Sequence, residues 1–150
     1  MSIADQVTAE IKQAMLRKDA GRLSALRMLK AALVNRSVEK GRELDDAEAR
    51  QVVMALVKQR RDAIEQFQKG GRDDLVQKET AEIAVLESYL PPAADPSAID
   101  EAVSSAIAET GATSAKDMGR VMKAALAKLQ GQTVDGKAVN DLVRRRLAGA

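Results

Sequence analysis

The residues best suited to chemistry lie in the last fifth of the chain, where basic side chains recur at helical spacing. Lys116, Arg120 and Lys123 fall within an arc of about 60° when residues are placed at about 100° each around a helix. Four more cations follow: Lys137, Arg144, Arg145 and Arg146. Such side chains bind phosphate through charge and hydrogen bonds. The pattern therefore predicts either a phosphate-binding surface or the solvent-exposed faces of two helices that pack together through their apolar sides.

Two residues in this region need a specific explanation. Helical spacing turns Arg144 and Arg145 outward but brings Arg146 towards the apolar side. Arg146 therefore lies along that surface with its charge in solvent, or pairs with a helix-terminal carbonyl, or helps to hold phosphate. Gly119 costs about 1 kcal/mol of helix stability, so we expect a neighbouring helix or a ligand to approach the backbone closely there.

Several familiar kinds of active site are excluded by composition. The 150 residues contain no histidine and no cysteine, which removes Ser–His and Cys–His nucleophiles and His/Cys zinc clusters. The pairs Asp45/Asp46 and Asp73/Asp74 fall at expected helix starts, where negative charge is locally favourable. Gly136-Lys137 lacks the upstream glycine and the following Ser/Thr of a phosphate loop. We expect no catalytic residues, no metal site and no cofactor.

Charge is distributed unevenly along the chain although its net value is only +2. Residues 1–90 carry 16 Lys/Arg against 15 Asp/Glu, residues 91–115 carry 0 against 4, and residues 116–150 carry 8 against 3. The final segment is therefore locally +5. This asymmetry favours an anion-binding surface there, although a basic last helix also complements its own dipole.

Targeting and membrane signals are weak in this sequence. No apolar run approaches the roughly 20 residues that a membrane helix needs, and the first ten residues lack a signal-peptide hydrophobic region. The absence of cysteine fits a reducing compartment. We therefore expect a cytoplasmic protein with no membrane partner, whose oligomeric state the sequence leaves open.

The elements that must position the basic residues are predicted to be helices throughout. Aromatic residues are limited to Phe67 and Tyr89, and helix-forming residues dominate. Helical spacing and capping residues predict helices near 2–16, 21–39, 46–69, 73–90, 96–110, 117–129 and 136–147. Met15 falls on the inward stripe of the first of these. The Pro91-Pro92 pair must end a helix, so we expect an all-α chain with an N-terminal lobe at 1–90, containing a long helical hairpin, and a C-terminal three-helix lobe at 91–150.

Five separated stretches agree with one known family. In order along the chain they are LRMLKAALVN (26–35), GRELDD (41–46), residues 58–91, KDMGRVMK (116–123) and DGKAVNDLV (135–143). Together they closely resemble the YqeY-like proteins, also called the GatB/YqeY family. The resemblance covers nearly the whole chain and rests on several ordered motifs.

The resemblance implies a relation to the C-terminal tail domain of GatB, a subunit of tRNA-dependent amidotransferases that ligate carbon and nitrogen with glutamine as the amide donor. That tail helps to hold tRNA, while other domains of the complex perform catalysis. The tail's Gly–Met–Lys pattern is matched here by Gly119, Met122 and Lys123, and its following turn begins at Gly136. The turn departs from the family tail, because Val139 follows Ala138 and no proline occurs there.

Two functions remain open at this stage. The first is a non-catalytic accessory protein that binds tRNA or another RNA through the seven basic residues, by shape and backbone, because the C-terminal lobe has no aromatic side chains for base stacking. The second is a protein–protein adaptor that uses the helical hairpin or the helix carrying Met118, Met122 and Leu126. Exposed methionine or leucine on that helix would favour the adaptor.

Overall fold

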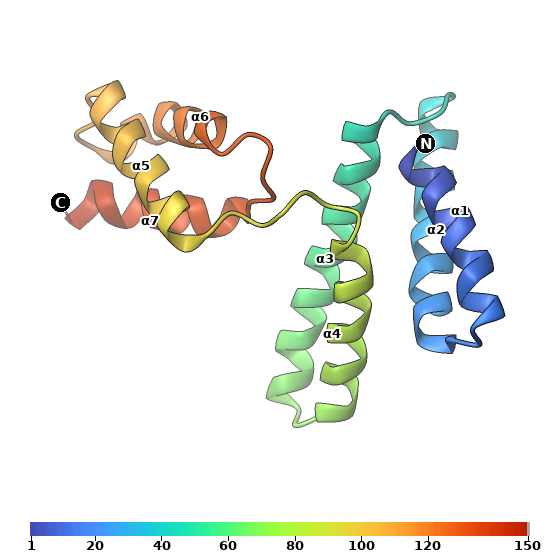
Figure 1. Cartoon of the computed structure of the whole chain (residues 1–150). Coiled ribbons are helices and arrows are strands. Elements are labelled where there is room, and N and C mark those ends of the chain that lie inside the picture. The colour runs from blue at the N-terminus through green and yellow to red at the C-terminus, as the bar shows by residue number, and fades with distance from the viewer. Residues whose placement is uncertain (150) are drawn as a thin grey trace. The chain divides into compact units, whose positions relative to one another are not determined.

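A computed structural model describes residues 1–149, and it confirms the all-α class (Figure 1). Within these residues the chain forms seven α-helices, one short 3-10 turn and no named strand. Contacts divide it into two compact units, Met1–Leu90 and Pro91–Ala150. Each unit has an apolar core of its own.

The N-terminal unit consists of two antiparallel helix pairs, visible in Figure 1. Its helices are α1 (Ile3–Leu16), α2 (Ala20–Lys40), α3 (Asp46–Lys69) and α4 (Asp73–Glu87). Reciprocal capping by Ser2 and Asp5 starts α1, as the sequence predicts. Gly41 ends α2 with φ of 69°, a left-handed conformation that glycine adopts without steric cost.

Helix α3 begins with a second reciprocal cap. The Asp45 carboxylate accepts the N–H of Glu48 at 2.8 Å, and the Glu48 carboxylate accepts the N–H of Asp45 at 3.1 Å. Replacing Asp45 by alanine removes the acceptor of the Glu48 N–H at the start of a long helix. We expect Asp45→Ala to lower the free energy of unfolding by about 1 kcal/mol, measured by urea denaturation. Asp46→Ala, which removes an acid of the first turn but not the cap, is the control and should cost less.

The core of the N-terminal unit is centred on α2, which contacts the other three helices. Leu26 and Leu29 are fully buried, and Val7, Val53 and Leu86 are buried against them from α1, α3 and α4. Met15 does not join this core, which contradicts its prediction as an inward residue: 53% of it is exposed. At about 100° per residue, Ala14 lies about 20° from Ile3 around α1, whereas Met15 lies about 120° away.

A partly buried ion cluster joins α3 to α4. Arg60 Nε lies 3.3 Å from Glu82 Oε2 and 3.8 Å from Glu79 Oε2, and the Arg60 guanidinium also contacts Met28 of α2. Burial and the neighbouring Glu82 charge raise the pKa of Glu79 despite the attraction of Arg60. Burial is the largest cause, and Arg60 offsets it only in part because its Nε lies closer to Glu82 than to Glu79.

The raised pKa gives Glu79 a defined effect on stability. A carboxyl group whose pKa is raised by folding stabilises the fold when protonated, and this contribution is lost as pH rises through the folded pKa. We therefore expect the neutral variant Glu79→Gln to be more stable than the wild type at pH 7, by less than about 1 kcal/mol. Urea unfolding should show this gain shrinking as the pH falls to about 4, near the ordinary pKa of glutamate. A gain of the same size at both pH values would contradict this interpretation.

The C-terminal unit contains α5 (Pro96–Thr110), the 3-10 turn η1 (Ala115–Asp117), α6 (Met118–Lys128) and α7 (Gly136–Gly149). Asp95 caps α5 and Pro96 occupies its first turn, as the sequence predicts. The buried core is made of small side chains. It comprises Ala102, Val103, Ala106, Val121, Ala125, Leu129, Val139, Val143 and Leu147.

Thr133, in the connection between α6 and α7, is hydrogen-bonded to the first residues of the C-terminal unit. Its hydroxyl donates to the Pro91 carbonyl at 2.6 Å and its N–H to the Pro92 carbonyl at 2.9 Å. The Ala94 N–H in turn donates to the Thr133 carbonyl at 2.8 Å. These bonds fix the loop that determines where α7 begins.

Candidate nucleic-acid interface

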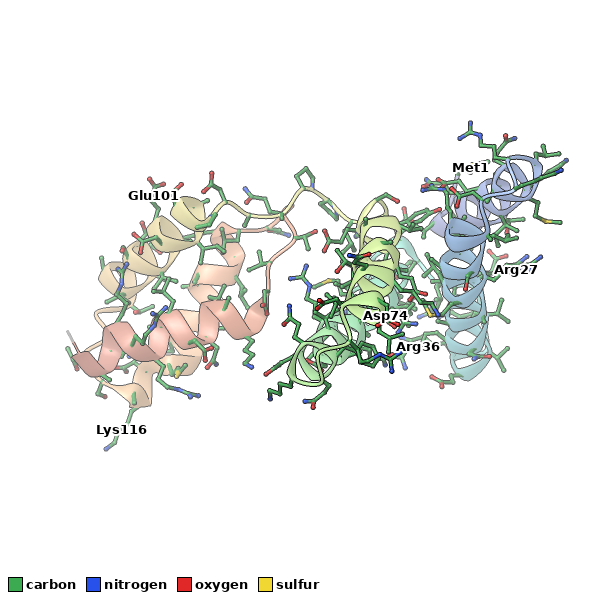
Figure 2. The ribbon with its side chains drawn as sticks, turned by 90° about the horizontal axis from the view of Figure 1, so that it is seen from below. Met1, Arg27, Arg36, Asp74, Glu101 and Lys116 are labelled. Carbon is green, nitrogen blue, oxygen red and sulfur yellow. The ribbon has the colours of Figure 1, made fainter. Side chains whose placement is uncertain are left out.

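Helix α6 separates a buried face from a cationic one. Val121, Ala125 and Leu129 are buried, while Met118 and Met122 are half-buried at the edge of the core. Val121, Ala125 and Leu129 therefore form the inward stripe of this segment. Lys116, Gly119, Arg120 and Lys123 are all exposed, and Figure 2 shows Lys116 pointing away from its unit.

Gly119 has open space on the side where a side chain would stand. A Cβ atom built there meets no atom within 4 Å, and the backbone is ordinary right-handed helix. The expected close approach of a neighbouring helix is therefore wrong within the described residues. Gly119 is the second residue of α6, and packing within residues 1–149 gives no reason for the missing side chain.

Asp117, just before α6, accepts backbone hydrogen bonds and forms an ion pair with Arg120, one of the predicted phosphate-binding residues. Its carboxylate accepts the N–H of Thr113 at 3.0 Å and that of Ser114 at 3.4 Å, and it pairs with Arg120. The pKa of Asp117 is lowered first by the Thr113 N–H and then by Arg120. Arg120 therefore shares its charge with a carboxylate. The spacing of three residues between the two side chains is the sequence signal for this pair.

Arg146 joins α7 to α5. Its guanidinium donates to Ser104 Oγ at 2.7 Å and pairs with Asp100, so its approach to the apolar side is explained by bonds inside the unit. Arg144 donates to Asn140 Oδ1 at 3.3 Å, one turn earlier on the same helix. By contrast, Lys116, Lys123, Lys137 and Arg145 have no ion-pair partner within residues 1–149.

The seven predicted residues do not gather into one cluster. Figure 1 shows α6 and α7 running in opposite directions, so the start of α6 lies towards the end of α7, and η1 packs against α7. The Gly136-Lys137 turn lies at the other end of the unit. On α7, Lys137 and Arg144 share one side, two turns apart, whereas Arg145 lies about 100° from Arg144. The compact part of the predicted site is therefore the exposed face of η1 and α6.

A shallow, open hollow of about 380 Å³ lies along the last two turns of α7. It is lined by Leu142, Arg145, Arg146 and Gly149. Only Arg145 offers an unpaired charge there among the described residues, since Arg146 is bonded to α5. The hollow can add one cationic contact to a ligand that covers this end of α7.

Carboxylates of the N-terminal unit are engaged in structural contacts. Asp45 caps α3, Asp74 pairs with Arg72 at 3.0 Å, and the Glu79/Glu82 pair surrounds Arg60. Across the part of the chain that the structure describes, no group of three or more His, Cys, Asp or Glu side chains has a metal-binding arrangement. No helix in that same part is long and apolar enough to cross a membrane.

Known proteins similar to this chain are named as mitochondrial. The chain is 35% identical over 103 residues to altered inheritance of mitochondria protein 41 of Lachancea thermotolerans, a match that covers 67% of this chain and 55% of that protein. It is 30% identical over 146 residues to the protein of the same name from Pyrenophora tritici-repentis, covering 95% and 79%. In Eremothecium gossypii the identity is 38% over 82 residues, covering 54% and 45%. The chain thus spans about half the length of the Lachancea thermotolerans and Eremothecium gossypii proteins.

These relatives overturn one expectation from the sequence. Their names place them in mitochondria, which contradicts the cytoplasmic assignment. The assignment was wrong because it rested on weak features, namely the lack of cysteine and of a signal-peptide pattern. Neither the relatives' names nor the family description states an enzymatic activity.

The family resemblance stated from the five motifs is confirmed by a full-length match. The family model described as Yqey-like protein matches residues 4–147, which include both units and all seven candidate basic residues. The chain therefore belongs to the family of YqeY-like proteins.

Proposed function

We propose that the chain is a non-catalytic RNA-binding accessory protein that holds tRNA or a similarly folded RNA through the exposed face of η1 and α6. One observation carries the proposal. Lys116 of η1 and Lys123 of α6 are exposed and unpaired within residues 1–149, and between them along the chain lies Gly119, beside which a Cβ atom would meet no atom within 4 Å. The relation of the family to the tRNA-holding tail of GatB gives the same ligand class.

The charges on this face favour a phosphate backbone as the ligand. Helix α6 carries no acidic side chain, and Asp117 at its start is already bonded to Thr113, Ser114 and Arg120. Two free lysines can therefore each meet a phosphate without repulsion from a neighbouring carboxylate. At Gly119 the absence of a side chain lets the sugar–phosphate chain come close to the helix.

The residues also favour recognition of RNA shape over base identity. Phe67 and Tyr89 both lie in the N-terminal unit, so residues 91–150 offer no aromatic ring on which a base could stack. A rigid helical face with cations at fixed spacing suits the backbone of folded or double-helical RNA. Arg144 and Arg145, towards the same end of the unit, extend the surface that such an RNA could cover.

Substitution of Gly119 by leucine tests the proposal at its central observation. The side chain has room, and leucine favours helix by about 0.8 kcal/mol over glycine, so stability should rise or stay the same. Affinity for bulk tRNA in a filter-binding titration should nevertheless fall about tenfold, because the side chain keeps the backbone of the RNA away.

The matched control is Gly21→Leu, at another helical glycine with open space beside it. It should leave the affinity for tRNA unchanged. If Gly119→Leu binds tRNA as tightly as the wild type, the α6 face is not where RNA approaches the protein.

The adaptor function has one supporting observation. Leu126 of α6 is 41% exposed, and the half-buried Met122 lies beside it. An apolar edge of this kind suits a helix of a partner protein. A pull-down from lysate with and without ribonuclease separates the two functions: partners that survive ribonuclease and are lost in Leu126→Glu would favour the adaptor.

A further inference from the structure

The turn between α1 and α2 exposes two large apolar side chains next to each other. Met15 is 53% exposed and Leu16 70%, and neither belongs to the core of the N-terminal unit. Figure 1 shows this turn at the end of the α1–α2 pair farthest from the N-terminus. The apolar pair is therefore carried at one end of the α1–α2 pair.

Three cations surround this apolar pair. Around α1, Lys12 lies about 60° from Met15 and about 40° from Leu16, one turn earlier, and Arg17 and Lys18 follow directly in the turn. All three are exposed, and none has an ion-pair partner among the described residues. Other charges at the turn are engaged: Asp19 caps α2 by accepting the Arg22 N–H at 3.1 Å, and Arg22 pairs with Glu10.

The backbone holds this turn in a defined shape. The N–H of Arg17 donates to the Gln13 carbonyl at 2.9 Å, and that of Asp19 to the Ala14 carbonyl at 3.0 Å. Lys18 has φ of 55°, a left-handed conformation that is costly for any residue with a side chain. The apolar pair and the cations are thus presented together by a closed turn.

Another exposed apolar pair, on α2, lacks this combination. Val38 is 73% exposed, with Val34 one turn before it. Three of the nearby cations are paired, since Arg36 bonds to Glu39, and both Lys40 and Arg42 bond to Glu48. Lys30, one turn before Val34, is exposed and has no ion-pair partner among the described residues. Val38 therefore offers an apolar surface whose neighbouring cations are mostly paired, and it serves as an internal comparison.

We propose that the α1–α2 turn docks on the surface of a lipid bilayer rich in anionic headgroups. Met15 and Leu16 enter the boundary between headgroups and acyl chains, and Lys12, Arg17 and Lys18 lie against the headgroup phosphates. Apolar burial and attraction to anionic lipid add in such surface binding. We expected no membrane partner because the sequence has no membrane-spanning segment. Two adjacent apolar residues in a turn do not form a long apolar segment, so that criterion does not detect them.

Vesicle flotation with the full chain tests this proposal. The chain should float with vesicles that contain about 30% anionic lipid and remain unbound with neutral phosphatidylcholine vesicles, because each basic residue near an anionic surface contributes about a fivefold change in binding. Met15→Ser/Leu16→Ser should lower binding at least about tenfold. Lys12→Gln/Arg17→Gln/Lys18→Gln should remove the preference for anionic lipid, and Val38→Ser should bind as the wild type does.

Three results would each overturn the membrane proposal. They are no flotation with anionic vesicles, equal flotation with neutral vesicles, and equal losses in Val38→Ser and in the Met15/Leu16 variant. Circular dichroism checks that every variant is folded, which is expected because all six substituted positions are exposed. The residues lie in a different unit from the α6 face, so this test is independent of RNA binding.

Discussion

Leu26→Ala is expected to lower the free energy of unfolding of the N-terminal unit by about 3 kcal/mol. Leu26 is fully buried on α2, the helix that contacts α1, α3 and α4. The substitution therefore removes apolar contacts from the point where the four helices meet, and a close-packed core refills such a cavity only in part. Urea unfolding followed by hydrogen exchange measures the loss and assigns it to a unit.

Leu16→Ala is the matched control, because it makes the same chemical change at a leucine that is 70% exposed. It should alter stability by no more than about 0.5 kcal/mol. Because each unit has its own apolar core, exchange protection in residues 91–149 should persist when Leu26→Ala unfolds residues 1–90. Loss of protection in both units at one denaturant concentration would contradict independent folding.

Lys116→Gln/Lys123→Gln is expected to weaken binding of bulk tRNA by about ten- to thirtyfold at low salt, since each lysine is proposed to neutralise one phosphate. Both side chains are exposed and unpaired within the described residues, so the change should leave stability nearly unaltered. Filter binding measures the affinity, and thermal unfolding checks the fold.

Lys58→Gln/Lys78→Gln removes the same charge from exposed lysines of the N-terminal unit, and it should bind tRNA as the wild type does. Equal losses in both double variants would mean that only net charge matters. In that case the α6 face would have no special role in holding RNA.

The parts of the fold that sequence predicted well depend on neighbours within a few residues. Ser2 and Asp5, Asp95 and Pro96, and Gly41 start or end helices through bonds and torsions that are local. The order and type of the helices could therefore be predicted from their spacing and caps. The ion pair between Arg120 and Asp117, which are three residues apart, could have been predicted from local spacing in the same way.

The parts that sequence missed depend on residues far apart in the chain. Arg146 is bonded to Asp100 and Ser104, more than forty positions earlier, and Thr133 is fastened to Pro91 at a similar separation. No periodicity within one helix contains that information. The exposure of the Met15 side chain and the open space beside Gly119 likewise depend on how the other helices pack, which spacing within one helix does not contain.

The most direct test of the RNA-binding proposal is a titration of bulk tRNA against the purified chain across a range of salt concentrations. With the two unpaired lysines of the α6 face and one or two of the α7 cations on phosphates, the logarithm of the binding constant should fall with the logarithm of salt at a slope of about −2 to −4. Binding that is absent at low salt, or that does not change with salt, would contradict the proposal that this surface holds an RNA backbone.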